Sequence, residues 1–175
     1  GTLQQVIALP YKRGAREAPI SYLERAEIEA VLQSIDRNTA LGRRDYALFA
    51  LMFNTGARVQ EALDLRRRDV RLEAPPQVRL RGKGNKVRLC PIWPVTAKLL
   101  DAYIHELPSS DGDPADALLF TNARGRPLTR FGVRYLLRRY VDAAAMQSPG
   151  MRDKSIHPHS LRHSTAIALL KAGVD

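Results

Sequence analysis

Residues 55–61, with the sequence TGARVQE, place an arginine where an anion would bind well. Gly56 is expected to end an apolar helix, and Arg58 then stands at the start of a second, shorter one. A helix dipole disfavours a cation at this end, so an anion held by the arginine and the free backbone N–H groups would remove the conflict. The competing interpretation is a surface arginine paired with Glu61 three residues later.

A second group of residues lies in the turn at 82–86, Gly-Lys-Gly-Asn-Lys. Glycines on both sides of Lys83 allow a hairpin tip to approach another backbone closely and to extend a cation into a groove. Lys86 is the alternative cation if the register of the loop differs. A pattern this short also occurs in ordinary solubilising turns, which is the competing interpretation.

A third group is the segment HPHSLRH at residues 157–163. On a helix, His159 shares a face with Arg162 and His163, at spacings of three and four. An arginine that stays charged beside imidazoles that titrate near neutrality suits a phosphate, because the arginine can hold its charge while a histidine transfers a proton. A zinc site is the weaker interpretation, since no glutamate lies between the histidines, no cysteine is near and Arg162 would repel the ion, so we expect no metal. His163 also fits a packing role.

The charge of the chain indicates a polyanionic partner. Twenty-eight basic residues face eighteen acidic ones, a formal net charge of +10, and nucleic acid is the first candidate. Residues 121–140 contain no acid and six arginines: Arg124, Arg126, Arg130, Arg134, Arg138 and Arg139. Because a guanidinium matches phosphate oxygens bidentately, we take the first five as candidate DNA-binding residues. A solvated basic face without function is the alternative.

The composition excludes several classes of protein. With 45% hydrophobic and 26% charged residues, the chain has the balance of an ordinary globular protein, and no apolar run approaches the roughly 18 residues of a membrane span. A single cysteine, Cys90, excludes an internal disulfide framework and fits a reducing cytoplasm. The length predicts one domain, which we expect over residues 21–175, after a polar lead-in segment over residues 1–20.

Periodicity predicts a mainly helical α+β fold. Helical spacing of apolar residues covers about 23–35, 43–54, a short stretch from residue 58, 94–106, 129–145 and a final helix from residue 159 or 160. Pro94 fits the first turn of its helix and Thr129 the N-cap of the next. The expected apolar set of that helix is Phe131, Val133, Leu136, Leu137 and Val141. Residues 76–93 alternate around the 82–86 turn and predict a β-hairpin. Residues 118–120 are either a short strand or buried coil.

In this order, the three motifs resemble the tyrosine recombinases of the phage integrase family, and the resemblance runs from Leu23 to Asp175. Each motif is weak alone, but three in the family's order are specific. The resemblance implies the DNA breaking-rejoining catalytic fold. It also implies that Arg58 and Arg162 clamp the non-bridging oxygens of a scissile phosphate, and that Lys83 protonates the leaving 5′ oxygen.

The remaining roles also come from the resemblance. His159 would assist proton transfer around the nucleophile, and Glu61 would orient Arg58. The implied reaction is a metal-free transesterification of duplex DNA through a 3′-phosphotyrosine, which needs no cofactor because bond energy is conserved.

One departure from the family pattern concerns the nucleophile. In the family, a second histidine or tryptophan and then the tyrosine follow the His-x-x-Arg motif, whereas thirteen residues follow Arg162 here and none is a tyrosine. The six tyrosines, Tyr11, Tyr22, Tyr46, Tyr103, Tyr135 and Tyr140, all precede the motif. We therefore expect a catalytic domain incomplete at its C-terminus, which binds DNA without cleaving it and is monomeric.

The full-length parent is expected to act as a tetramer on duplex DNA in the cytoplasm, at the nucleoid. The main alternative is a non-catalytic DNA-binding protein on a recombinase scaffold, and a zinc-dependent nuclease is a more remote one. The sequence does not distinguish integration from excision or resolution.

Overall fold

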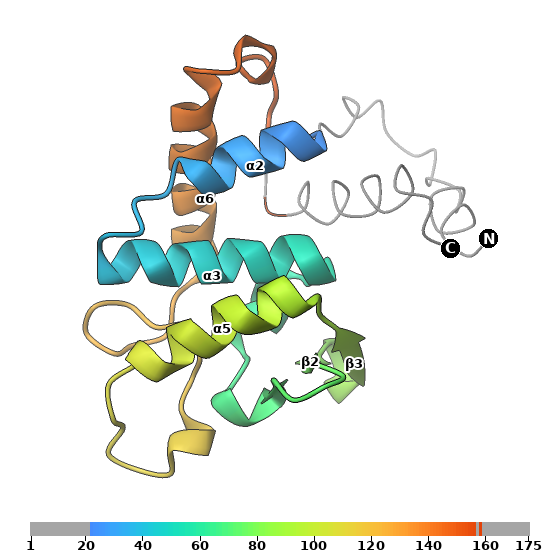
Figure 1. The fold of residues 1–175 in the computed structure, drawn as a ribbon, viewed down its shortest axis with the longest axis vertical. Coiled ribbons are helices and arrows are strands. Elements are labelled where there is room, and N and C mark those ends of the chain that lie inside the picture. The colour runs from blue at the N-terminus through green and yellow to red at the C-terminus, as the bar shows by residue number, and fades with distance from the viewer. Residues whose placement is uncertain (1–21, 157, 159–175) are drawn as a thin grey trace, which may run out of the picture.

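The computed structural model describes residues 22–156 and residue 158. The described chain is mainly helical with one small antiparallel sheet, as predicted (Figure 1). The helices are α2 (Arg25–Gln33), α3 (Ala40–Thr55), α4 (Val59–Leu63), α5 (Pro94–Glu106) and α6 (Arg130–Ala145). The strands are β1 (Val70–Arg71), β2 (Gln77–Arg81) and β3 (Val87–Pro91). Single 3-10 turns are η1 (Arg67–Asp69), η2 (Lys83–Asn85), η3 (Pro114–Asp116) and η4 (Pro149–Met151).

Local signals set the ends of the longer helices. Thr129 caps α6, because its hydroxyl oxygen accepts a hydrogen bond from the backbone N–H of Gly132 at 3.0 Å. Thr39 caps α3 in the same way, accepting from Gly42 at 3.0 Å. Pro94 is the first residue of α5, where its missing N–H costs nothing. The predicted roles of Thr129 and Pro94 are therefore confirmed.

The centre of the molecule is α3. It packs against α2 and α5, while α6 runs across α2 and also contacts α4 (Figure 1). Five of its apolar side chains are fully buried: Ala47, Leu48, Phe49, Leu51 and Met52. At the junction with α4, Gly56 adopts the left-handed conformation (φ 66°, ψ 21°) and ends α3 as predicted.

The sheet has the order β1-β2-β3 with antiparallel pairing throughout. The predicted hairpin is confirmed: Val78 lies opposite Cys90 and Leu80 opposite Arg88. Val78 and Leu80 are fully buried and fix the inner face of the sheet. The two-residue strand β1 was too short for alternation to predict it. Residues 118–120 are buried coil, joined to Arg66 by a single bridge at Leu118.

The burial of α6 corrects one prediction. Val133, Leu137 and Val141 are buried as expected, but Phe131 is 82% exposed. Two helical positions correspond to a rotation of about 200°, so Phe131 lies on the opposite face from Val133. The helix buries one stripe only, and its first turn lies outside the core. Tyr140 is buried, whereas Tyr135 is 67% exposed.

In the described part of the chain, no helix is both long enough and apolar enough to span a membrane. The helix predicted from residue 159 or 160 lies outside the described residues.

Candidate functional site

Arg58 lies at the junction between α3 and α4. The left-handed Gly56 turns the chain at the end of α3, and Arg58 occupies the N-cap position of α4 with an extended backbone (φ −67°, ψ 151°). Ala57 between them is fully buried, while the side chain of Arg58 is exposed. The backbone of this junction is thus held by the core and presents the guanidinium to solvent.

Glu61 connects this junction to the sheet. Only 7% of the residue is exposed. Its Oε1 accepts a hydrogen bond from the backbone N–H of Arg58 at 2.8 Å and lies 3.2 Å from Nη2 of Arg88 on β3. Glu61 therefore contacts Arg58 at its backbone N–H, and its carboxylate forms an ion pair with Arg88.

The hairpin tip approaches the same carboxylate. Gly82 comes so close to Glu61 that a Cβ on this glycine would lie 3.3 Å from Oε2. The backbone N–H of Gly82 donates to the carbonyl of Lys86 at 2.8 Å and closes the loop. Gly84 (φ 70°) and Asn85 (φ 57°) supply the left-handed turn that exposes both lysines, Lys83 and Lys86. The structure thus brings the arginine junction and the lysine hairpin together at Glu61.

The candidate DNA-binding arginines form one exposed stretch, the arginine surface, defined as Arg124, Arg126, Arg130, Arg134 and Arg138. The first two lie on a tight loop in which the side-chain oxygen of Asn122 accepts the backbone N–H groups of both. The other three recur every fourth residue on α6 and share a face of it. Within the described residues, none of the five forms an ion pair with an acid. The positive charge of this surface is therefore not neutralised by ion pairs within the described part of the chain.

A buried polar network supports the arginine surface from beneath. Nε and Nη2 of Arg44 contact Oδ1 of Asp45 at 2.9 and 2.7 Å, and Nη1 of Arg44 donates to the carbonyl of Thr121 at 3.1 Å. The hydroxyl of Tyr140 on α6 donates to Oδ2 of Asp45 at 2.5 Å. Burial and this hydrogen bond to the carboxylate raise the pKa of Tyr140 above its ordinary value. The network joins α3 to α6 and to the loop that carries Arg124.

His159, Arg162 and His163 lie outside the described residues, but the segment before them is anchored. Nζ of Lys154 lies 2.5 Å from Oε1 of Glu27 on α2 and donates to the carbonyl of Tyr22 at 3.1 Å. Sequence analysis did not identify Lys154 or Glu27. The two residues are 127 positions apart in the chain, so no local sequence pattern predicts their ion pair.

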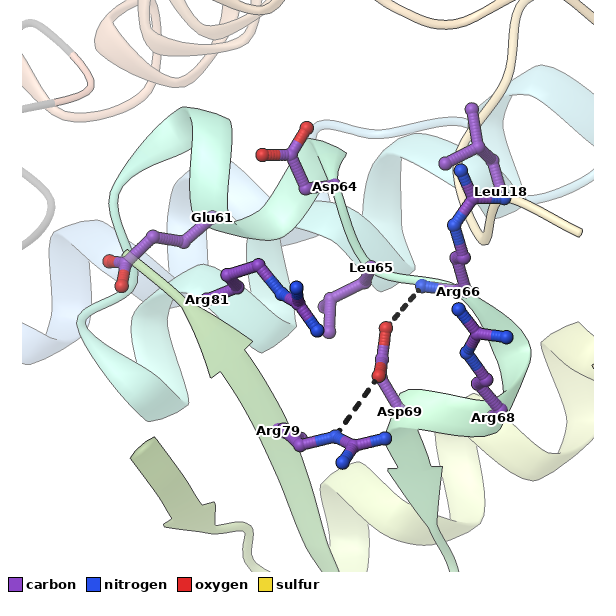
Figure 2. A pocket seen from close by; sticks show the side chains of 9 residues that line it. All are labelled: Glu61, Asp64, Leu65, Arg66, Arg68, Asp69, Arg79, Arg81 and Leu118. Atoms are coloured by element: carbon purple, nitrogen blue, oxygen red, sulfur yellow. Dashed lines mark hydrogen bonds and ion pairs between the residues drawn. The ribbon is translucent and has the colours of Figure 1, made fainter. Parts of the chain in front are cut away.

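A cavity of about 280 Å³ opens between η1 and β2 and is bordered by Glu61 of α4. Figure 2 shows four arginine side chains around it, Arg66, Arg68, Arg79 and Arg81. Three of these arginines have partners within the protein. Nε of Arg79 lies 3.3 Å from Oδ1 of Asp69. The side chain of Arg66 donates to the backbone carbonyl of Asp116, and that of Arg68 forms an ion pair with the Asp116 carboxylate. These contacts tie the η3 loop to η1. Glu61 borders the cavity, but its side chain lies away from the arginine cluster (Figure 2).

Metal and thiol chemistry find little support in the described part of the chain. There, no three His, Cys, Asp or Glu side chains are grouped closely enough to hold a metal ion. Cys90 is free and half-buried, and burial raises the pKa of its thiol, which disfavours the reactive thiolate.

Comparison with known proteins gives a consistent result. The family model described as "Phage integrase family" matches residues 21–175. A putative integrase/recombinase, y4rC, of Sinorhizobium fredii is 36% identical over 99% of this chain and 51% of its own length. Tyrosine recombinase XerC of Staphylococcus epidermidis is 35% identical over 85% of this chain and 48% of its own length. The chain thus spans about half the length of these curated relatives.

Solved structures show the same fold. The XerH site-specific recombinase, in a post-cleavage complex with palindromic difH substrate, has a TM-score of 0.73 and 28% identity, covering 93% of this chain and 45% of that one. XerA recombinase has a TM-score of 0.73 and 26% identity, covering 91% of this chain and 53% of the other.

Proposed function

The chain belongs to the phage integrase family of tyrosine recombinases, and from this we propose that it is the catalytic domain of a site-specific DNA recombinase. The proposal assigns residues 21–175 to that domain, after a lead-in over residues 1–20. The observation that supports it most directly is the meeting of the Arg58 junction and the lysine hairpin at Glu61. The backbone segments that carry two cations, Arg58 and Lys83, are thereby brought to one carboxylate, and a phosphate site needs such converging donors.

The proposed chemistry follows from the charges of the site. Arg58 and Arg162 hold the non-bridging oxygens of the scissile phosphate and stabilise the charge that builds up in the transition state. Lys83 gives a proton to the leaving 5′ oxygen, with Lys86 as the alternative donor, and His159 assists proton transfer at the nucleophile. A tyrosine becomes joined to the 3′ phosphate and is released when a 5′ hydroxyl attacks, so no cofactor or metal is needed.

The proposed partner is duplex DNA. XerH and the λ integrase were both solved with DNA. The arginine surface on α6 and the 122–126 loop would contact the DNA backbone, because its charge is exposed and no acid among residues 22–156 pairs with it. The parent protein is proposed to assemble as a tetramer on DNA, at the nucleoid in the cytoplasm. None of the six tyrosines follows Arg162, so the 175-residue chain alone is proposed to bind DNA without forming a covalent link. The same chain is also proposed to be a monomer.

A phosphate at a nick tests the arginine clamp directly. Two nicked duplexes of one sequence would be compared by fluorescence anisotropy, one with a 3′-phosphate at the nick and one with a 3′-hydroxyl. We expect Arg58→Ala and Arg162→Ala to weaken binding of the phosphorylated duplex by about tenfold, because each loses a charge-assisted contact. The matched control is Arg25→Ala, an exposed arginine on α2 that pairs with Glu29. Equal losses in Arg25→Ala and Arg58→Ala would remove the basis for the clamp.

A non-catalytic DNA-binding protein on the same scaffold is the second candidate, because the exposed arginine surface would support DNA binding without any cleavage chemistry. The source reading frame beyond the codon for Asp175 decides between the two. A histidine or tryptophan followed by a tyrosine supports the recombinase, whereas an immediate stop codon supports the binding protein.

A further inference from the structure

We propose that Arg88 is a positioning residue whose ion pair with Glu61 joins the lysine hairpin to Arg58 and keeps the Arg58 guanidinium available for phosphate. The proposal rests on the proposed function of Arg58. Arg88 itself contacts no substrate in this scheme.

The first argument is the geometry of the shared carboxylate. A single oxygen, Oε1 of Glu61, contacts the backbone N–H of Arg58 at 2.8 Å and Nη2 of Arg88 at 3.2 Å. The side chain of Glu61 is only 9% exposed, so these contacts are weakly screened by water. A shift of this carboxylate would therefore move both the start of α4 and the inner face of β3.

The second argument is the place of Arg88 in the hairpin. Arg88 pairs with Leu80, one step below the Arg81–Val87 pair that closes the strands. Leu80 is fully buried, so this pair marks the point where the hairpin leaves the core. Beyond it, the chain continues through the half-buried Gly82 to the exposed Lys83. Anchoring Arg88 to Glu61 restrains the base of this projecting loop and hence the position of Lys83.

The third argument is electrostatic competition. Removing Arg88 would leave the charge of this nearly buried carboxylate less well compensated, which favours a closer approach of a neighbouring cation. The Arg58 side chain starts three residues away and belongs to the residue whose N–H already binds Glu61. Capture of the Arg58 guanidinium by Glu61 would withdraw it from a phosphate. In the structure Arg88 forms an ion pair with the Glu61 carboxylate, and the Arg58 side chain is exposed.

The neighbouring strand supplies a matched control. Arg79 on β2 pairs with Asp69 at 3.3 Å and is 45% exposed, whereas Arg88 pairs with Glu61 at 3.2 Å and is 48% exposed. The two ion pairs therefore have nearly the same length and solvent exposure. The two pairs differ in what the acid binds besides its arginine. Asp69 accepts the backbone N–H of Arg66 at the start of η1, whereas Glu61 accepts the backbone N–H of Arg58. A purely structural contribution to stability should be similar for both.

The experiment measures the ratio of affinities for the two nicked duplexes, with 3′-phosphate and with 3′-hydroxyl, in the full 175-residue chain. We expect Arg88→Met to lower this ratio by about three- to tenfold and Arg79→Met to leave it unchanged. Arg88→Lys should keep most of the ratio, since the lysine can form an ion pair with the Glu61 carboxylate. Arg88→Met should have a smaller effect in a Glu61→Gln background, because both changes remove the same interaction. Urea denaturation of each variant separates these effects from a loss of folding.

The outcomes separate this inference from the proposed function. If Arg58→Ala abolishes the preference for the 3′-phosphate and Arg88→Met matches Arg79→Met, the positioning role of Arg88 is wrong while the clamp stands. If the preference is absent in the unmodified chain or survives Arg58→Ala, the proposed function is wrong and the role of Arg88 is overturned with it.

Discussion

At the residue scale, Glu61 and Asp45 illustrate how a buried carboxylate is kept in place. Each accepts hydrogen bonds on a nearly buried side chain and lies against an arginine, Arg88 in one case and Arg44 in the other. Removing one partner of such a pair costs more than the pair contributes, because the other charge stays buried. Acids of this kind therefore join elements that the chain places far apart.

Buried tyrosines predict how stability responds to alkali. Tyr103 is 7% exposed, its hydroxyl donates to the carbonyl of Leu119 at 2.8 Å, and burial raises its pKa from 10.0 to about 12. The folded chain thus holds this proton more tightly than the unfolded chain. The stabilisation is fully present below pH 10, and the free energy of unfolding should fall as the pH rises from 10 towards 12.

Urea denaturation at a series of alkaline pH values measures this dependence. Tyr103→Phe should show a shallower fall than the unmodified protein, while the exposed Tyr135→Phe should keep the full slope. Identical slopes for Tyr103→Phe and the unmodified chain would show that Tyr103 is not the group responsible.

At the element scale, the connection from α3 to α4 decides where Arg58 lies. Ten of the sixteen residues of α3 are buried, and Gly56 ends the helix. The core thus fixes the direction in which the chain arrives at the site. The left-handed Gly56 then turns the chain, so that Arg58 becomes the N-cap residue of α4.

A substitution at Gly56 tests this connection. Gly56→Ala should lower the free energy of unfolding by about 1 kcal/mol, because a Cβ is disfavoured in the left-handed region, and Gly56→Asn should cost less. The effect would be measured by urea denaturation. Gly150→Ala in η4 is the control, since no heavy atom lies within 4 Å of its added Cβ. A loss at Gly56 no larger than at Gly150 would contradict the argument.

At the scale of the whole molecule, the net charge is +10, and its arginines differ in whether they have partners within the protein. Three of the four arginines around the cavity at η1 and β2, Arg66, Arg68 and Arg79, bind acids or carbonyls of the protein itself, and they connect loops. The arginine surface on α6 and the 122–126 loop has no such internal partners among the described residues. The same residue type therefore has a structural use on one side and is available to a polyanion on the other.

The salt dependence of DNA binding measures this difference. Arg134→Ala should reduce the slope of log affinity against log salt concentration by about one, because one phosphate contact and its released counterion are lost. Arg25→Ala on α2 should leave the slope unchanged. Anisotropy titrations of an intact duplex between low and physiological salt provide the measurement. An equal change of slope in both variants would mean that DNA binds without preference for the α6 face.

Sequence by itself determined the features that depend on neighbouring residues. The caps of α5 and α6, the left-handed Gly56 and the Gly-Lys-Gly-Asn-Lys hairpin follow from local backbone preferences, and all four are present in the structure. Family membership also followed from sequence, because three short motifs in the family's order are specific, and the family model matches residues 21–175. Arg58, Glu61 and Lys83 could be named for the same reason.

Only the tertiary structure decided which residues meet. The pairing of Glu61 with Arg88 and of Lys154 with Glu27 joins segments 27 and 127 residues apart, and neither pair leaves a local pattern. Phe131 was misplaced because helical spacing defines a stripe but not where the core begins beside it. Local preferences act within a few residues, whereas burial and ion pairing depend on the final packing, and that packing sets which side of each helix and hairpin becomes part of the site.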